Sequence, residues 1–145
     1  MPIFEDKCTK IELSGTSYPI KCDMLVLNKI QEKYGDIDRF RFKLSGLIPK
    51  LDENGKVMYT DDGKVANEGF GMPDTLAVTD CLYWFAQEGA EITGKPDIDR
   101  NKIIRSIDIS PSELGMMLHE EYMRCLTQKN PRTTQDPSQT KEVQK

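Results

Sequence analysis

The chain has 145 residues, of which 37% are hydrophobic and 30% charged, and its net charge is −4. This length fits one domain with its own core, and the acidic balance argues against a nucleic-acid-binding protein or one that binds anionic membranes. No apolar run approaches the roughly 20 residues that span a bilayer, and the N-terminus lacks the pattern of a signal peptide, so we expect a cytoplasmic protein.

The N-terminal region alternates apolar and polar residues, which predicts a β-hairpin with strands at 9–13 and 17–22. Glycine at the first loop position favours a type II′ turn centred on Gly15 and Thr16. That turn places four apolar residues on one face, in the pairs Ile11 with Ile20 and Leu13 with Tyr18.

Two helices are expected next. Asp23 is a good N-cap for a helix that ends near Tyr34, before Gly35. A shorter helix is expected at 37–44, because apolar residues recur there every three or four positions.

Residues 50–72 form a glycine-rich insertion with few large apolar groups, and the chain as a whole shows no evident internal repeat. Asn54-Gly55 predicts a small hairpin, and a second short strand is expected after Gly63. An insertion of this length is either functional or a tolerated surface excursion.

The most apolar helix is expected from Pro73 to Gln87 or Glu88, with Gly89 at its end. Further on, Asp97 or Asp99 is expected to cap a short helix that contains three isoleucines, Ile103, Ile104 and Ile107.

The motif Ser110-Pro111-Ser112-Glu113 is a capping box that opens a last helix to about Leu126. Residues 127–145 contain one aliphatic side chain and many polar residues, which predicts a disordered tail. We therefore expect one globular domain at 1–126, of an α+β, mostly α class, in which the hairpin packs on a bundle of four to five helices.

The chain holds no recognised catalytic, metal or cofactor motif, so we expect a protein that is not an enzyme. His119 is the single histidine, and the four cysteines lack the paired spacing of zinc ligands. The cysteines are expected to be buried thiols. The alternation of basic and aromatic residues at 39–43 could stack on single-stranded nucleic acid, but at helical spacing the rings are expected to face the core.

Several segments resemble the tail assembly chaperones of long-tailed phages and prophages of Gram-positive bacteria. The similarity lies in Lys10-Ile11-Glu12-Leu13-Ser14-Gly15-Thr16-Ser17-Tyr18-Pro19-Ile20, in Ile30-Gln31-Glu32-Lys33-Tyr34-Gly35, in the aromatic helix leading to Glu88-Gly89-Ala90, and in the last helix with its polar tail. The resemblance implies a protein that coats the tape-measure protein, recruits tail-tube subunits and associates with itself. The insertion at 50–72 is longer than the family's compact pattern.

Two groups of residues are candidates for partner binding, since aromatic and methionine side chains are typical interface residues. They are Tyr83, Trp84 and Phe85, and Met116, Met117 and Met123. Both groups could instead belong to the core. Two other functions stay open: another phage component, such as a head–tail connector or minor tail protein, and a small regulatory protein that binds proteins or nucleic acid.

Overall fold

The computed structural model describes residues 8–127, which form a mixed, mostly helical fold with two antiparallel two-stranded ribbons and five helices. The α+β, mostly α class and the N-terminal hairpin are as the sequence predicts. All but the first residue of the predicted tail at 127–145 lies outside the described residues. The elements are β1 (Thr9–Leu13), β2 (Thr16–Ile20), α2 (Met24–Tyr34), α3 (Ile37–Ser45), β3 (Leu47–Pro49), β4 (Asn67–Phe70), α4 (Thr75–Thr93), α5 (Arg100–Arg105) and α6 (Pro111–Thr127).

The hairpin β1–β2 has a register two residues away from the predicted one. Its turn is Ser14-Gly15, both with positive φ, and Ile11 pairs with Tyr18. Positive φ at both central positions defines a type I′ turn, and the Ser14 amide donates to Asp108 (3.1 Å), which fixes this residue in the turn. A shift of two residues keeps every side chain on its expected face, so the apolar face is still buried.

The helices α2 and α3 begin and end close to the predicted residues. The carboxylate of Asp23 accepts from the Val26 amide (3.2 Å), and Asp36 accepts from the Arg39 amide (2.9 Å). Gly35 ends α2 as expected.

The central helix α4 corrects two predictions. Pro73 is predicted as the first helical residue, but it lies before the helix, which begins at Thr75 with Asp74 as its N-cap. The helix also continues through Gly89 to Thr93. Gly89 is inside the helix because β2 passes so close that a Cβ there would lie 2.0 Å from the Pro19 carbonyl oxygen. The glycine therefore allows helix and strand to pack, and Gly94, with positive φ, ends the helix instead.

The last two helices keep their predicted caps. Asp99 caps α5, which ends at Arg105, so Ile107 lies beyond the helix. Ser110 accepts from the Glu113 amide (3.1 Å) at the start of α6, as a capping box requires.

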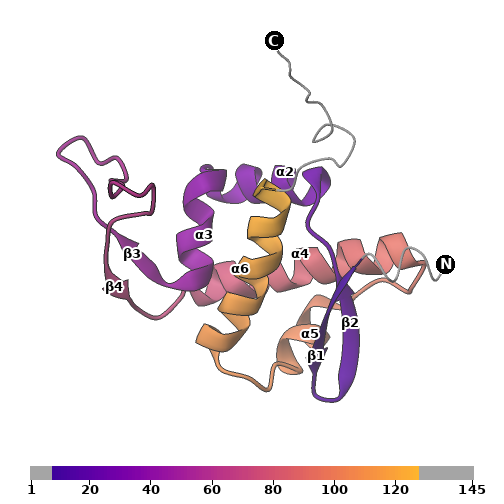
Figure 1. Cartoon of the computed structure of the whole chain (residues 1–145). Helices are drawn as coiled ribbons and strands as arrows, with labels where there is room; N and C mark the ends of the chain where they lie inside the picture. Colours follow the sequence, from indigo (N-terminus) through magenta and orange to yellow (C-terminus); the bar gives the residue numbers. More distant parts are fainter. Residues whose placement is uncertain (1–7, 128–145) are drawn as a thin grey trace, which may run out of the picture.

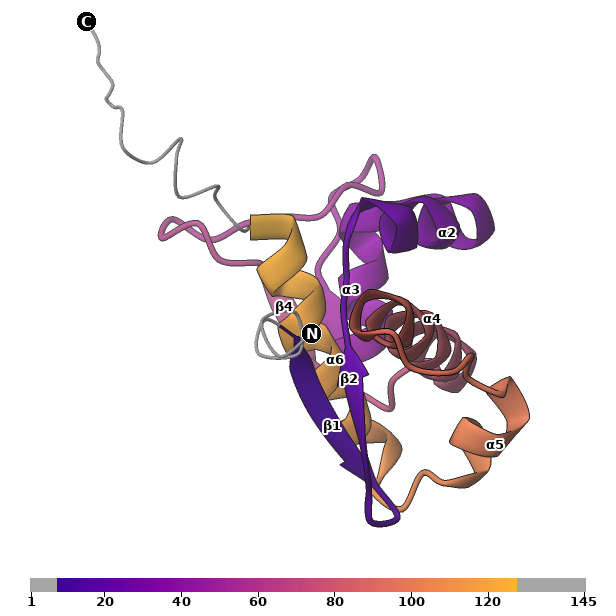
Figure 2. The same cartoon turned by 90° about the vertical axis from the view of Figure 1, so that its right-hand side faces the viewer.

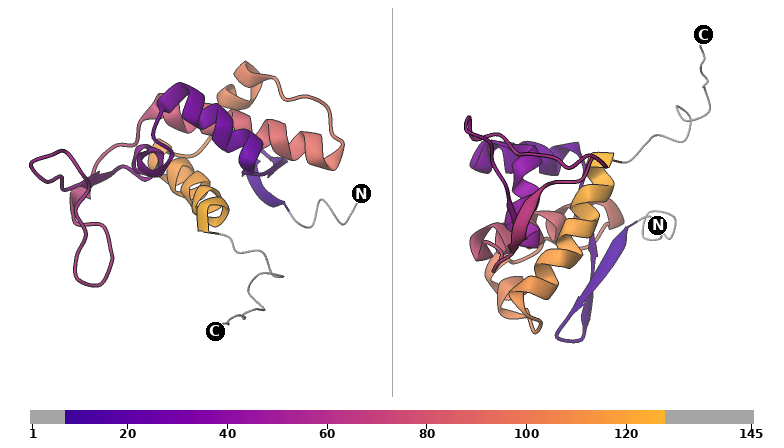
Figure 3. Two further views of the ribbon diagram at one scale, coloured as in Figure 1. Left: turned by 90° about the horizontal axis from the view of Figure 1, so that it is seen from above. Right: turned by 60° about the vertical axis from the view of Figure 1, so that its left-hand side comes forward.

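The core lies between α4 and the elements around it (Figures 1 and 2). The hairpin packs on α4 through β2, and directly after β2 the Lys21 amide donates to the Phe85 carbonyl (3.0 Å). Helix α6 packs on α3 and α4. Residues 47–72, called the arm below, extend from this body on the side away from the hairpin (Figures 1 and 3). None of the helices in residues 8–127 has both the length and the apolar character needed to cross a bilayer.

The carboxyl groups of Asp23 and Glu88 lie close together where α2 begins beside α4, and they predict that the stability of the fold depends on pH. A hydrogen bond shared with Asp23, partial burial and the charge of Asp23 raise the pKa of Glu88 to about 7. A carboxyl with a raised pKa binds its proton more tightly in the folded state, so folding loses stability as pH rises from about 4.5 to about 7.

We expect Glu88→Gln to remove this loss. The melting temperature of the variant should fall less than that of the wild type between about pH 5 and about pH 8. Equal falls in the two proteins, measured by circular dichroism at matched ionic strength, would show that Glu88 is not the titrating group.

Candidate protein-binding site

The arm carries most of the large apolar side chains that the described residues leave exposed. Six of ten such side chains lie there, and two more, Leu76 and Met116, lie on neighbouring helices. Phe70 is 66% exposed and Tyr59 is 55% exposed. Exposed apolar groups gathered on one segment mark a surface for a partner more often than isolated ones do. The six are Ile48, Leu51, Met58, Tyr59, Phe70 and Met72.

An internal repeat, which the sequence reading missed, builds the tip of the arm. Asn54-Gly55-Lys56-Val57 and Asp62-Gly63-Lys64-Val65 lie eight residues apart, and both form turns with the same backbone bonds. The Asp52 amide donates to the Lys56 carbonyl (2.8 Å), as the Thr60 amide donates to the Lys64 carbonyl (2.7 Å). The shared Gly-Lys-Val triplet was the available signal.

A ring of three backbone hydrogen bonds joins the two turns at their base. The Lys50 amide donates to Ala66 (2.8 Å), the Ala66 amide to Met58 (2.9 Å), and the Met58 amide to Lys50 (2.9 Å). These bonds give the arm its shape without a core of its own. The apolar side chains of the arm are therefore not needed to hold its shape and can contact another molecule.

A groove of about 400 Å³ lies between α3, the arm and α6. Its apolar lining includes an aromatic ring from α3, several arm side chains and two methionines of α6. Its polar lining residues are Arg41, Ser45, Lys64, Asn67 and His119. The apolar lining residues are Phe42, Leu47, Tyr59, Val65, Phe70, Met116 and Met123.

The methionines predicted to bind a partner lie at this groove or beside it. Met116 is 48% exposed, and Met117 and Met123 are half-buried. Met117 joins the other two at a further hollow along α6. Partner contact by these three residues stays a prediction.

The three aromatic residues of α4 lie elsewhere. Phe85 is fully buried, so in this fold it belongs to the core and has no surface to offer a partner, contrary to the prediction. Trp84 is half-buried and packs edge-on against the Tyr34 ring, with centroids 6.4 Å apart. Tyr83 is half-buried beneath the Arg100 guanidinium, 5.6 Å from its ring centroid.

Burial shapes the ionisation of the histidine and the cysteines. Partial burial, together with the nearby Arg41 charge, lowers the pKa of His119. Burial raises the pKa of the Cys22 and Cys81 thiols, which disfavours the reactive thiolate. Within residues 8–127, no three side chains of the metal-ligating types lie close enough to share an ion.

Two buried carboxylates hold the body together. Asp80 on α4 accepts from Lys33 (2.6 Å), from the Tyr34 hydroxyl (2.7 Å) and from Arg100 (2.7 Å). It thereby joins α4 to α2 and α5.

Glu121 on α6 fastens both ends of the hairpin. It accepts from the Thr9 hydroxyl (3.1 Å), from the Cys22 amide (2.8 Å) and from Arg124 (2.7 Å). A buried charge with this many partners is a structural group.

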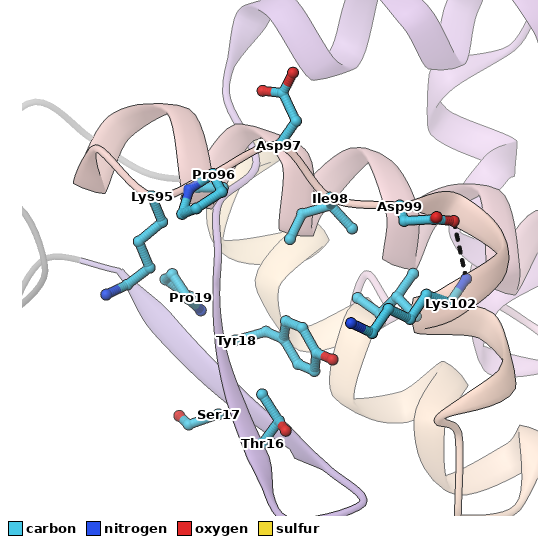
Figure 4. Close-up of a pocket in the computed structure, with 12 residues that line it drawn as sticks. Thr16, Ser17, Tyr18, Pro19, Lys95, Pro96, Asp97, Ile98, Asp99 and Lys102 are labelled. Carbon is cyan, nitrogen blue, oxygen red and sulfur yellow. Dashed lines mark hydrogen bonds between the residues drawn. The ribbon is translucent and has the colours of Figure 1, made fainter.

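A second hollow, of about 380 Å³, lies between β2 and the connection from α4 to α5 (Figure 4). Tyr18 and Ile98 give it an apolar floor, but its carboxylates serve the fold. Asp99 accepts from the Lys102 amide (3.1 Å), and Asp97 accepts from Gln87 (3.4 Å). The groove at the arm is therefore the stronger candidate site, because exposed apolar groups surround it.

No protein-family model, curated protein or solved structure matches this chain.

Proposed function

We propose that this protein is a tail assembly chaperone of a long-tailed phage or prophage, which binds the tape-measure protein and recruits tail-tube subunits in the host cytoplasm without catalysing a reaction. The observation that carries the proposal is the arm, whose apolar side chains are held outside the core by backbone hydrogen bonds and face solvent next to the groove. An assembly factor needs such a surface, since burial of apolar area drives association between proteins.

The resemblance of the hairpin and of the α2 end to that family supports the same proposal. The two buried carboxylates, Asp80 and Glu121, accept hydrogen bonds that join elements of the fold. Self-association fits a protein that coats an extended partner.

Co-purification tests the proposal. The full chain is co-expressed with the tape-measure and tail-tube proteins from the same gene cluster, and each partner is quantified after affinity capture. We expect the double variant Phe70→Ser, Met116→Ser to capture less tape-measure protein than wild type does, by a factor of about 10 or more, since interface anchors carry most of the binding energy.

The matched control is Met24→Ser, Leu25→Ser, which removes two exposed apolar side chains at the opposite end of α2 from the arm. It should leave capture of the tape-measure protein unchanged. Equal capture by wild type and the Phe70, Met116 variant would contradict the assigned surface, and failure of both partners to co-purify with wild type would contradict the function.

Mass spectrometry of purified particles separates a chaperone from a connector or minor tail protein. A chaperone leaves the finished particle, so we expect no peptides of this chain there. Its presence at stoichiometric amounts would favour the structural component instead.

A further inference from the structure

Cations line the apolar surface at the arm. Arg41 and Lys64 lie in the groove, and Arg39 and Lys43 lie in an adjoining hollow that shares Phe42 and Leu47 with it. Among the described residues, Asp74 is the one carboxylate that lines these two hollows, and Glu120 lines the further hollow along α6. The whole chain has a net charge of −4, so this surface has the opposite balance to the protein that carries it.

Two of the four cations have no carboxylate partner among residues 8–127. The Arg39 guanidinium donates to the neutral carbonyl of Gly55, and the Lys64 ammonium makes no hydrogen bond or ion pair with the described residues. Arg41 contacts Asp38 (3.4 Å) while it stacks on the Phe42 ring, 4.6 Å from the centroid. The cationic charge is therefore available to a ligand.

Part of the lining follows the length of one helix, α6. Met116, His119 and Met123 lie along two turns of α6, a length of about 10 Å. Thioether and aliphatic groups cover much of the surface between the rings, which suits side chains of a peptide better than the stacked bases of a nucleic acid. An amphipathic helix presents anchors at matching intervals along its own axis.

We propose that the groove binds an acidic amphipathic helical segment of a partner protein, with apolar anchors on one face and Asp or Glu on the flanks that meet Arg39 and Lys64. The chain's own residues 128–145 fit poorly, because they carry four basic residues against two acidic ones. As a statement about the partner of the chaperone, the inference rests on the proposed function, but its test does not use a phage protein.

Selection from a random 16-residue peptide library against the full chain tests this chemistry. Peptides are kept if they bind wild type and lose at least about 10-fold in affinity for Phe70→Ser, Met116→Ser, which marks them as groove ligands. We expect these peptides to be net acidic, with apolar residues three or four positions apart. Their affinity should fall as salt is raised.

Charge reversal supplies the matched pair. Arg39→Glu, Lys64→Glu changes one half-buried and one exposed position, and an acidic residue in the first turn of α3 is compatible with its helix dipole. This variant should bind the acidic peptides at least about 10-fold more weakly. Lys102→Glu, at the hollow beside the hairpin, should bind them as wild type does.

Groove-dependent peptides that are neutral or basic would overturn the inference, and so would a selection that yields none. A second copy of this chain as occupant would also overturn it, and light scattering would show that case as a dimer that the Phe70, Met116 variant abolishes. Acidic peptides without capture of the tape-measure protein would remove the proposed function and leave the inference standing. If capture of the tape-measure protein depends on Phe70 and Met116 but the selected peptides show no preference for acidic residues, the proposed function stands and the inference falls.

Discussion

Replacing Gly89 by alanine is expected to lower the free energy of unfolding by about 3 kcal/mol, although the same change inside an exposed helix gains about 1 kcal/mol. The reason is the crossing of α4 and β2. A Cβ at Gly89 would lie 2.0 Å from the Pro19 carbonyl oxygen and 3.0 Å from the Ile20 nitrogen. Both are backbone atoms of a paired strand, so no side-chain rotation relieves the overlap.

Gly115 on α6 gives an independent case, since its Cβ would lie 2.2 Å from the Leu44 carbonyl oxygen at the end of α3. Gly71→Ala is the control, because its Cβ would make an ordinary contact of 3.5 Å with Ile48. In urea denaturation, the free energy of unfolding should be well below that of wild type for Gly89→Ala and Gly115→Ala, and close to it for Gly71→Ala. Stability gains at Gly89 or Gly115 would contradict the packing described for α4 and α6.

Asp80→Asn is expected to lower the free energy of unfolding by about 3 kcal/mol, because it leaves two cations around a buried group that can no longer balance them. Lys33 and Arg100 are partly exposed and can turn toward water, which keeps the loss at the lower end for a broken buried pair. Asp61→Asn, at an exposed turn of the arm, is the control and should unfold as wild type does.

The pH dependence of the Asp80 effect has a definite sign. Burial by itself would raise the pKa of Asp80, but hydrogen bonds from Lys33, Tyr34 and Arg100 outweigh it and lower the pKa below its ordinary value of 3.8. A lowered pKa contributes stability that is present above about pH 3.8 and is lost as pH falls through the folded-state pKa. The difference in unfolding free energy between wild type and Asp80→Asn should therefore shrink at pH values below this range. A difference independent of pH would mean that the charge of Asp80 is not what stabilises the junction.

Local signals in the sequence predict the helix starts well and the long-range packing poorly. Asp23 and the Ser110 capping box act within one turn of chain, so their effect is readable from neighbouring residues. Gly89 has the same local appearance as a helix-ending glycine, but its role depends on Pro19, seventy residues earlier in the chain. The hairpin register likewise involves a distant residue, Asp108, whose carboxylate accepts a hydrogen bond from the Ser14 amide in the turn.

The sequence predicts one part of the candidate site, the methionines of α6, and does not predict the apolar residues of the arm. The methionines of α6 are a recognisable candidate for partner binding from the sequence alone, and Met116 is exposed in the structure. The aromatic run on α4 was ambiguous, because a helix with apolar groups around most of its circumference gives no sign of which face its neighbours cover. The arm's own apolar residues are scattered among turn residues, so no local pattern marks them, and the three backbone hydrogen bonds among Lys50, Met58 and Ala66 bring them together.

Hydrogen–deuterium exchange on the full chain, alone and in complex with the tape-measure protein, tests the central claim most directly. If the arm and the groove bind the partner, amides in 47–72 and 111–123 should become protected in the complex, and those at the hollow beside the hairpin, 95–99, should exchange as before. Protection confined to the hairpin side, with the arm exchanging at its free rate, would contradict the account.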